Sequence, residues 1–530
     1  MSVNSQIEFE RPEEVLSSST QPGPLPRSGH WLRRNARLIV EIALLLVFAA
    51  LVRLPYFIRT VIDWDESTFI LMADSLLNGH LPQTEYSAFK PPLAYVPYAL
   101  FLAMFGQSIA AIRFGGLICV SVASVVIYLA CRKRFGINGA LIAGLCVSAF
   151  ATVDRNCGCT MLEHIALVPL SFIVLVWPRH LLTARRGFGI GMLIGLAAAL
   201  KTNFGGFILA PLCLLSRQRS LHGWKRTVWI ATALMLGLSL PLVAAVPAYW
   251  LSGNIDLWWH SCILTNVSYL SHNAQSMDDT VHKFTQGCTS ANLAGFALSW
   301  LSPILALLIA CKGESKFNRE RAFLIAMAMF AACGILTAVA TGAFHIRHYF
   351  VVVVPFTAAM SGFLFQLALS SRRRVALGLT TLCLLTLSLS AVADEYANVW
   401  RTVVENRSTD TAYKVAEYLN SRNVYGQYIY VTRWNICYWM TGGLIPTRFI
   451  HPVHIGNREI LSTLYTQPTD PISELRSIFR KKPVFVVTDV VGEQIRGDDK
   501  LKRALADELR RDYALERIID DTGIFRRNAL

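Results

Sequence analysis

Charged residues are scarce in this chain. Of its 530 residues only 16% are charged, while 53% are hydrophobic. A typical water-soluble domain carries about 25% charged residues, so the composition excludes that class and indicates a membrane protein. Acidic residues are especially few, 35 against 50 lysines and arginines, which leaves a net charge of +15. The basic residues cluster between apolar segments, where they meet anionic lipid headgroups, so they give no reason to expect a nucleic-acid partner.

Other features are missing as well. The sequence has no glycine-rich phosphate loop, so a nucleotide-sugar donor is not expected. It shows no internal repeat and no matched pair of interrupted spans, which argues against a transporter fold. Most of the 12 cysteines lie in apolar segments and pack as small hydrophobes. The spacing of Cys157 and Cys159 alone predicts neither a disulfide nor a metal site.

The apolar segments define the expected topology. Residues 1–37 are polar, show no signal peptide and end in a basic cluster, which predicts a disordered cytoplasmic tail. The predicted spans are 38–57, 110–131, 138–153, 163–178, 187–200, 203–216, 227–250, 291–311, 322–341, 349–370 and 375–393. The basic clusters between them all lie in the cytoplasm only if the number of spans is odd. Residues 91–105 are therefore expected in the outer interface of the membrane, which leaves 11 spans.

The composition changes after Ala393 to that of a soluble domain. Residues 394–530 contain predicted helices at 410–421, 471–481 and 500–512, and predicted strands at 428–432, 484–488 and 515–519. The expected fold class is therefore mainly α and polytopic, with about 11 transmembrane helices over residues 38–393. A small extracytoplasmic α/β domain follows them.

The outer loop between the first two predicted spans, residues 58–107, carries several reactive side chains. It begins with the acidic cluster from Asp63 to Glu66 and continues with residues 67–78, whose apolar positions recur at helical spacing. This pattern predicts an amphipathic helix lying on the membrane. Asp65 stands where that helix begins, so its carboxylate is expected either to cap the first turn or to act as a base.

The ordered set of motifs in this loop resembles a known family. Asp65-Glu66, the helix, Lys90-Pro91-Pro92-Leu93 and then Phe105-Gly106 are similar to the first outer loop of membrane glycosyltransferases of the GT-C class. The resemblance is to dolichyl-phosphate-mannose-protein mannosyltransferases and lipid A aminoarabinose transferases. It implies a polyprenyl-phosphate sugar as donor and the first Asp of the motif as general base.

The resemblance also assigns the acidic residues of the expected site. Asp65 is the first choice for the base, and Asp63 is its nearest rival because it lies two residues away. Glu66 is expected to be structural, since an acidic residue in a first helical turn is favoured by the helix dipole. Glu163 corresponds to an acidic residue that supports the base or the acceptor in the family, although a solvated glutamate at a helix start explains it equally well.

Basic residues are expected to hold the phosphate of the donor. Lys90 matches the lysine that the family associates with the lipid phosphate, and its alternative is a lysine that reaches out to the headgroups. Arg347, His348 and Tyr349 resemble the family's basic and aromatic step before a late span, where an arginine suits bidentate phosphate contact. Lys201, at the outer end of a predicted span, is a weaker candidate.

Three departures from the family pattern affect the cofactor and the sugar. In aminoarabinose transferases a loop histidine and a glutamate before Lys-Pro-Pro hold a metal, but here Phe89 takes the place of the glutamate. We therefore expect no metal site, with a divalent ion as the alternative, and keep His260 of the outer loop 251–290 as a substrate-binding candidate. Thr68-Phe69 and Ser87 replace side chains that the family uses to recognise the donor, so aminoarabinose is not the expected sugar.

These expectations combine into one function. The chain is predicted to be an inverting glycosyltransferase that moves a sugar from a polyprenyl-phosphate donor, of the undecaprenyl type, to a cell-envelope acceptor. The acceptor class is a lipid A, a lipopolysaccharide core, another glycan or a protein. The expected location is the inner membrane, with the N-terminus cytoplasmic and the C-terminal domain periplasmic. A transporter or flippase of lipid-linked sugars, and a protein that only anchors others, remain as alternatives.

Overall fold

The computed structural model describes residues 28–152, 155–178, 182–217, 219, 223–268, 304, 308, 318–340, 347–369, 385, 389–404, 410–451, 453–464, 469–489 and 499–528. The chain divides into two compact units, residues 1–44 and 45–530. Helix α1 (Ser28–Arg53) begins in the first unit at residue 28, ahead of the predicted start of the first span at residue 38. Residues 28–37 are thus helical, whereas the sequence predicted a disordered tail for them.

Among the described residues, five stretches are long and apolar enough to cross a membrane: Ala36–Ile58, Ile109–Phe135, Trp224–Val243, Glu320–Ala338 and His348–Leu369. They correspond to α1 with the 3-10 turn η1 (Leu54–Ile58), α4 (Ile109–Phe135), α10 (Trp224–Val243), α16 (Asn318–Ala340), and η7 (Arg347–Val353) with α17 (Val354–Leu369). Apolar helices of this length mark an integral membrane protein.

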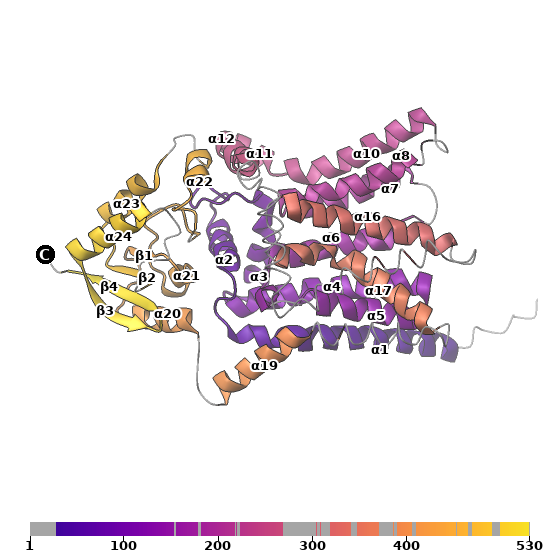
Figure 1. Ribbon diagram of the computed structural model, residues 1–530, viewed down its shortest axis with the longest axis horizontal. Helices are drawn as coiled ribbons and strands as arrows, with labels where there is room; N and C mark the ends of the chain where they lie inside the picture. The colour runs from indigo at the N-terminus through magenta and orange to yellow at the C-terminus, as the bar shows by residue number, and fades with distance from the viewer. Residues whose placement is uncertain are drawn as a thin grey trace, which may run out of the picture. The chain divides into compact units, whose positions relative to one another are not determined.

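Shorter apolar helices account for most of the other predicted spans. They are α5 (Ile137–Phe150), α6 (Leu162–Val176), α7 (Ala184–Ala198), and η4 (Thr202–Ile208) continued by α8 (Leu209–Arg217). The predicted spans 291–311 and 375–393 lie almost entirely outside the described residues, so the number of 11 stays a prediction. In Figure 1, α4, α5 and α17 run side by side, and all three pack on one another.

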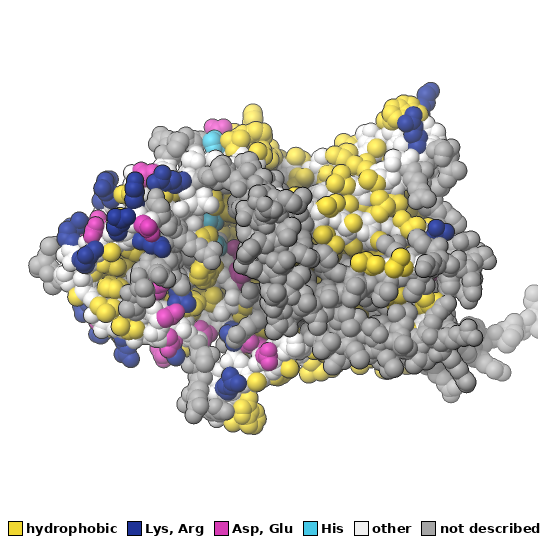
Figure 2. All heavy atoms as spheres, viewed as in Figure 1, with side chains coloured by type: hydrophobic (Ala, Val, Ile, Leu, Met, Phe, Trp, Pro, Cys, Tyr) yellow, Lys and Arg dark blue, Asp and Glu magenta, His cyan; other side chains and the backbone are white. Residues whose placement is uncertain are grey.

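Small residues bring α7 and α10 into close contact. A Cβ atom on Gly191 would lie 2.1 Å from the carbonyl oxygen of Leu234, and one on Gly195 would lie 2.4 Å from that of Leu238. Both glycines therefore let the two backbones touch, as small residues do between membrane helices. The opposite side of α10 exposes large apolar side chains, among them Trp229, Leu236 and Leu240. Figure 2 shows such side chains spread over this part of the surface, as expected of a face turned to lipid.

The predicted helix of the outer loop exists, and part of its polar side is buried against other segments of the chain. Helix α2 (Trp64–Leu77) has nine buried residues, including Thr68 and Ser75. The hydroxyl of Thr68 accepts a hydrogen bond from Asn435 at 3.0 Å, and that of Ser75 donates to Glu85 at 2.5 Å. The predicted helix is therefore confirmed, other protein segments cover part of its polar side, and its position on the membrane stays a prediction.

Short elements complete the membrane part. They are η2 (Pro92–Ala94), α3 (Val96–Phe105), η3 (Arg155–Gly158), α11 (Val246–Leu251), α12 (Ile255–Trp259), the π-helix η5 (His260–Leu264) and α19 (Ser390–Val403). The C-terminal helices are α20 (Thr411–Ser421), α21 (Ile436–Thr441), α22 (Arg458–Thr463), α23 (Pro471–Arg480) and α24 (Asp499–Asp512).

A four-stranded mixed sheet organises the C-terminal part. Its strands are β1 (Ile429–Val431), β2 (Phe485–Asp489), β3 (Tyr513–Ile519) and β4 (Thr522–Arg527), in the spatial order β1-β2-β4-β3. The pair β1 and β2 is parallel, with Tyr430 opposite Val486, and the other two pairs are antiparallel. Apolar residues of α23 and α24 pack against the sheet around Val486. The three predicted helices and three predicted strands are all found, and β4 is additional.

The length of α3 bears on the topology. Its 10 residues rise by roughly 15 Å at 1.5 Å per residue, about half of the 30 Å hydrocarbon core. We therefore expect residues 91–105 to stay in the outer interface, so that a cysteine placed at the exposed position Asn138 is labelled only from the cytoplasmic side. The measurement is cysteine accessibility in a background without the 12 native cysteines. A second cysteine at the exposed Tyr425 should be labelled only from the other side, and labelling of both from one side would refute the topology.

Candidate active site

The two aspartates of the acidic cluster make different contacts. Asp63 is the N-cap of α2, and its Oδ1 accepts the backbone N–H of Asp65 at 2.9 Å. The sequence left open whether Asp65 caps this helix, and the structure gives that place to Asp63. Asp65 lies in the first turn instead, with its side chain 29% exposed. Its carboxylate is therefore available for a different role.

The partner of Asp65 comes from the far end of the sequence. Nε2 of His451 lies 3.0 Å from Oδ1 of Asp65, across 386 residues of chain. Nδ1 of His451 accepts the backbone N–H of Val453 at 3.3 Å, so in the neutral ring the proton sits on Nε2. Nε2 then donates to the carboxylate. Among the described residues, no hydrogen bond is recorded for the second carboxylate oxygen of Asp65, Oδ2.

Positive groups around Asp65 keep it ionised. Burial alone would raise the pKa of Asp65, but the hydrogen bond from His451 and the charge of Lys90 hold it well below its usual value. Asp63 behaves in the opposite way. Burial and the neighbouring charge of Asp65 raise the pKa of Asp63 above its usual value. Of the two carboxylates, Asp65 is the one that stays charged in a crowded site.

Lys90 is held in place through its backbone and its stem. Its carbonyl oxygen accepts a hydrogen bond from the amide of Gln83 at 2.8 Å, and its ammonium lies 4.5 Å from the ring centroid of Phe89. The amide of Gln83 is fixed in turn by the hydroxyl of Tyr249, at 2.8 Å from its oxygen. Asn266 donates to the carbonyl oxygen of Phe89 at 2.9 Å. The Lys-Pro-Pro turn is thus tied to two segments that follow α10.

A second charged pair lies beside the first. Glu163, at the start of α6, is buried and accepts from the ammonium of Lys201 at 2.7 Å. The solvated glutamate that the sequence allowed as an alternative is therefore wrong. The ammonium of Lys201 also lies 3.2 Å from the ring centroid of Tyr349. Because Lys201 is paired with Glu163 and packed on Tyr349, it is better described as part of a structural ion pair than as a lysine available to bind phosphate.

His348 lies close to the aspartate pair and to Glu163. Its side chain is only 6% exposed, and its Nε2 has no hydrogen-bond partner among the described residues. His348 interacts electrostatically with Asp63, Asp65 and Glu163, so it lies close to all of them. A buried nitrogen without a partner is costly unless a ligand or a water binds it.

Behind these groups, a buried ion pair fixes the start of α2. Arg113 of α4 donates to both oxygens of Glu66, with 2.7 Å from Nε to Oε1, and also to the carbonyl oxygen of Tyr56. The backbone N–H of Thr160 adds a bond to Glu66 Oε1 at 2.5 Å. Removing one member of such a pair leaves a buried charge and costs about 3–5 kcal/mol. Glu66 is thus structural, as the sequence suggested.

The structure brings together Asp63, Asp65, Lys90, His348, Glu163, Lys201 and Tyr349 through the contacts above. It does not bring His260 into this cluster, since Nδ1 of His260 contacts the carbonyl oxygen of Thr463 at 3.1 Å. The side chain of Arg347 lies outside the described residues, so its role stays a prediction. The sequence missed His451 and His454, because neither stands in a motif or near the loop in the chain.

The residues at the family's metal position do not form a metal site. The ring of Phe89 stands there and lies 5.3 Å, centroid to centroid, from the ring of His454. No group of three or more histidine, cysteine, aspartate or glutamate side chains suited to a metal ion occurs within the described ranges. The donor set of the family's metal does not fit this chain.

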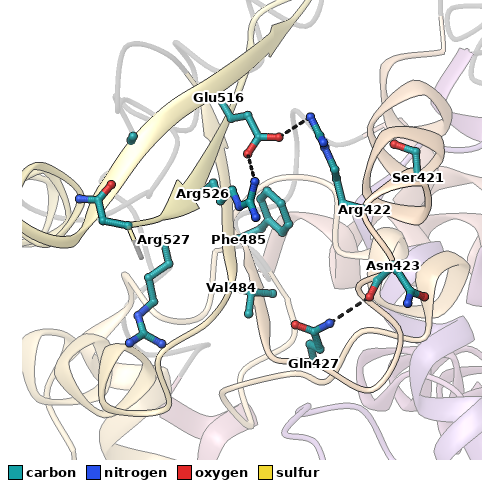
Figure 3. Close-up of a pocket in the computed structure, with 11 residues that line it drawn as sticks. Ser421, Arg422, Asn423, Gln427, Val484, Phe485, Glu516, Arg526 and Arg527 are labelled. Carbon is teal, nitrogen blue, oxygen red and sulfur yellow. Dashed lines mark hydrogen bonds and ion pairs between the residues drawn. The ribbon is translucent and has the colours of Figure 1, made fainter. Parts of the chain in front are cut away.

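A cavity of about 1020 Å3 opens in the C-terminal part, between α20 and the sheet. Figure 3 shows Glu516 reaching toward Arg422 and Arg526 across it. Since Glu516 neutralises two of the cations and all lining residues belong to the C-terminal part, this cavity is separate from the Asp65 cluster. We therefore expect the catalytic residues in the Asp65 cluster and not in this cavity.

Comparisons with known proteins give the fold of the chain and a sequence match over its middle part. A sequence model described as dolichyl-phosphate-mannose-protein mannosyltransferase matches residues 89–250. No curated protein matches the chain. The crystal structure of ArnT from Cupriavidus metallidurans bound to undecaprenyl phosphate has a TM-score of 0.61 and 13% identity, over 93% of this chain and 98% of its own. Its apo state has a TM-score of 0.57 and 13% identity over the same shares.

A more distant likeness is to the oligosaccharyltransferase of Archaeoglobus fulgidus in complex with Zn and sulfate. Its TM-score is 0.51 and its identity 14%, over 87% of this chain and 70% of its own. At such identities these likenesses establish the fold, which is of the GT-C type. The resemblance predicted from the loop motifs is confirmed by the sequence model and by the fold.

The capping role of Asp63 predicts two different outcomes at that position. Asp63→Asn keeps a side-chain oxygen for the N–H of Asp65, so the unfolding temperature should stay near that of the wild type. Asp63→Ala removes the cap and should cost about 1 kcal/mol. Thermal unfolding of the purified chain measures both. Equal losses in the two variants would show that the charge of Asp63, and not its capping oxygen, stabilises the start of α2.

Proposed function

We propose that this protein transfers a sugar from a polyprenyl-phosphate donor to an acceptor hydroxyl or amine at the outer surface of the membrane, with inversion at the sugar carbon. The observation that carries the proposal is the state of Asp65. One carboxylate oxygen is held by His451, the side chain is partly exposed, and the lowered pKa keeps it ionised. A general base must be deprotonated and must be reachable by the acceptor, and Asp65 meets both conditions.

The reaction follows from the charges around Asp65. The acceptor atom attacks the anomeric carbon, so a new bond to the acceptor forms while the bond from that carbon to the phosphate oxygen breaks. Asp65 takes the acceptor proton, and the leaving group is the polyprenyl phosphate. Negative charge grows on that phosphate in the transition state, and we expect Lys90 and His348 to stabilise it. The ammonium of Lys90 beside Phe89 and the unpartnered Nε2 of His348 support this role.

Two observations support a polyprenyl-phosphate donor. The loop carries Lys90-Pro91-Pro92 within the region matched by the mannosyltransferase model, and the similar ArnT fold is known with undecaprenyl phosphate bound. A long isoprenoid tail requires a membrane-embedded enzyme, and the described residues before 394 include five apolar stretches long enough to cross a membrane. We propose an envelope lipid, glycan or protein as acceptor, in agreement with the expected outer position of α2.

The experiment that tests the function compares the envelopes of cells with and without the protein. Mass spectrometry of extracted lipids, glycans and envelope proteins should show at least one species that loses the mass of a single sugar when the protein is absent. Complementation with the intact chain should restore it. Identical envelopes under conditions in which the protein is expressed would contradict the proposal.

A substitution at the proposed base separates chemistry from folding. Asp65→Asn keeps the shape of the side chain but does not accept the proton, so the sugar-modified species should disappear. The variant should still insert into the membrane at the wild-type level, because Asp63 provides the cap. The readout is the same mass spectrum, with Asp63→Asn as the matched control that keeps activity. Full activity in Asp65→Asn with loss in Asp63→Asn would move the base to Asp63.

The phosphate contacts make a further prediction about metals. With Phe89 at the family's ligand position, side chains must neutralise the phosphate, so transfer by the purified chain should survive a chelator. Lys90→Ala should lower turnover by about 10²-fold, and more than it weakens donor binding, because the charge builds up in the transition state. We expect the same of Arg347→Ala. Loss of activity with chelator and its return with a divalent metal would overturn this account.

A further inference from the structure

A row of three contacting rings leads from the Lys-Pro-Pro turn to the carboxylate of Asp65. The rings of Phe89 and His454 are tilted at 47° with centroids 5.3 Å apart, and those of His454 and His451 are stacked at 23° with centroids 4.6 Å apart. Nε2 of His451 then lies 3.0 Å from Asp65 Oδ1. We propose that this row of rings positions Asp65, so that the C-terminal part of the chain completes the catalytic site. The inference rests on the proposed function, with Asp65 as the base.

The orientation of His451 is fixed from several sides. The backbone N–H of Val453 occupies its Nδ1, and the ring of Trp64 meets it edge to face at 6.5 Å. His454 covers one of its faces. The imidazole therefore has one arrangement in which Nε2 points at Asp65. A side chain that is only 11% exposed keeps such an arrangement because few rotamers remain open to it.

His454, which stacks on His451, is uncharged. His454 is 5% exposed, and burial holds its pKa well below its usual value, so it stays neutral at physiological pH. A neutral ring stacks on His451 without placing a positive charge against it. Its other neighbour, Phe89, precedes Lys90 directly. The row of rings thus connects the residue next to Lys90 with the residue that contacts Asp65.

Two further contacts hold the C-terminal part against the loop. The amide of Asn435 donates to the hydroxyl of Thr68 on α2 at 3.0 Å. The carbonyl oxygen of Arg448 accepts the N–H of Ser87 at 2.7 Å. Both contacts are made by loop residues that follow Asp65 in the sequence, one on α2 and one after it. The position of His451 is therefore set by the fold of the C-terminal part and not by the hydrogen bond to Asp65 alone.

Positioning is the role that the geometry supports for His451. The hydrogen bond occupies Oδ1, while Oδ2 has no hydrogen-bond partner among the described residues, so Oδ2 is the oxygen we expect to receive the acceptor proton. His451 does not relay this proton, because its Nε2 already carries one and its Nδ1 is bonded to Val453. Errors of about 1 Å in placing a catalytic group lower rates by roughly 10²-fold, so loss of this contact should be visible in turnover.

The test uses substitutions that separate the hydrogen bond from bulk and from stacking. His451→Gln keeps an N–H donor, whereas His451→Leu keeps volume without a donor. His454→Phe keeps a ring for stacking, whereas His454→Ala removes it. The matched control is His80→Leu, which removes a histidine that pairs with a carboxylate, Glu85, at 3.1 Å on the exposed surface of the same loop. All five are made in the full chain.

The first measurement is transfer by membranes supplied with the lipid-linked sugars extracted from the same cells, together with binding of undecaprenyl phosphate. We expect His451→Leu and His454→Ala to lower turnover by roughly 10- to 100-fold while binding of undecaprenyl phosphate changes little. His451→Gln, His454→Phe and His80→Leu should stay near the wild type. Equal losses in the Gln and Leu variants at His451, or equal losses in both variants at His454, would overturn the proposal.

The second measurement does not depend on any activity. Infrared difference spectra between each protein and its Asp65→Asn counterpart report the pH at which the Asp65 carboxyl protonates. Because a donated hydrogen bond stabilises the charged form, the pKa of Asp65 should rise in His451→Leu and stay low in His451→Gln. An unchanged titration in His451→Leu would show that the contact does not act on Asp65. If the titration shifts but no transfer occurs in any protein, the contact stands and the proposed function fails.

Discussion

The ion pair between Glu66 and Arg113 is the constraint on which the site depends. It joins the first turn of α2 to the membrane helix α4 in a place where neither side chain reaches water. A charged pair in such surroundings is stable only when its remaining polar atoms are bonded, and here Tyr56 and Thr160 supply these bonds. Asp65 precedes Glu66 directly, so the pair also fixes where the proposed base stands.

The rest of the site is assembled from segments that are distant in the chain. The loop carries Asp65 and Lys90, the start of η7 carries His348, and the C-terminal part carries His451. The loop is attached to its neighbours by hydrogen bonds to backbone groups, from Asn266 to the carbonyl oxygen of Phe89 and from Ser87 to that of Arg448. These bonds do not involve the sugar or the acceptor, so the framework of the proposed site does not depend on either.

Much of the fold was visible in the sequence, because long apolar runs and the change of composition after Ala393 have direct physical causes. The C-terminal helices and three strands follow from their periodicity, whereas β4 was missed because its polar residues, such as Arg526 and Arg527, do not resemble a strand at the centre of a sheet. The motif around Asp65 and Lys90 predicted where the site lies. The role of each residue in it could be assigned only from the three-dimensional structure.

Two assignments show why. Asp63 and Asp65 are the same residue type and stand two positions apart, so only the backbone geometry of the first turn decides which one caps α2. His451 lies 386 residues from its partner, so no local pattern connects them. In the same way, the burial of Glu163 follows from its pairing with Lys201, which depends on how α6 and the end of α7 approach each other. Contacts of this kind are products of the tertiary structure.

The central claim is that the bond between sugar and phosphate is broken at Asp65. The most direct measurement quantifies free polyprenyl phosphate in proteoliposomes that contain the full chain, cell-extracted lipid-linked sugars and envelope acceptor. The account predicts that one free polyprenyl phosphate appears for each sugar transferred, and that none appears above background with Asp65→Asn. Movement of the intact lipid-linked sugar across the bilayer, without release of the phosphate lipid, would contradict it and identify a flippase.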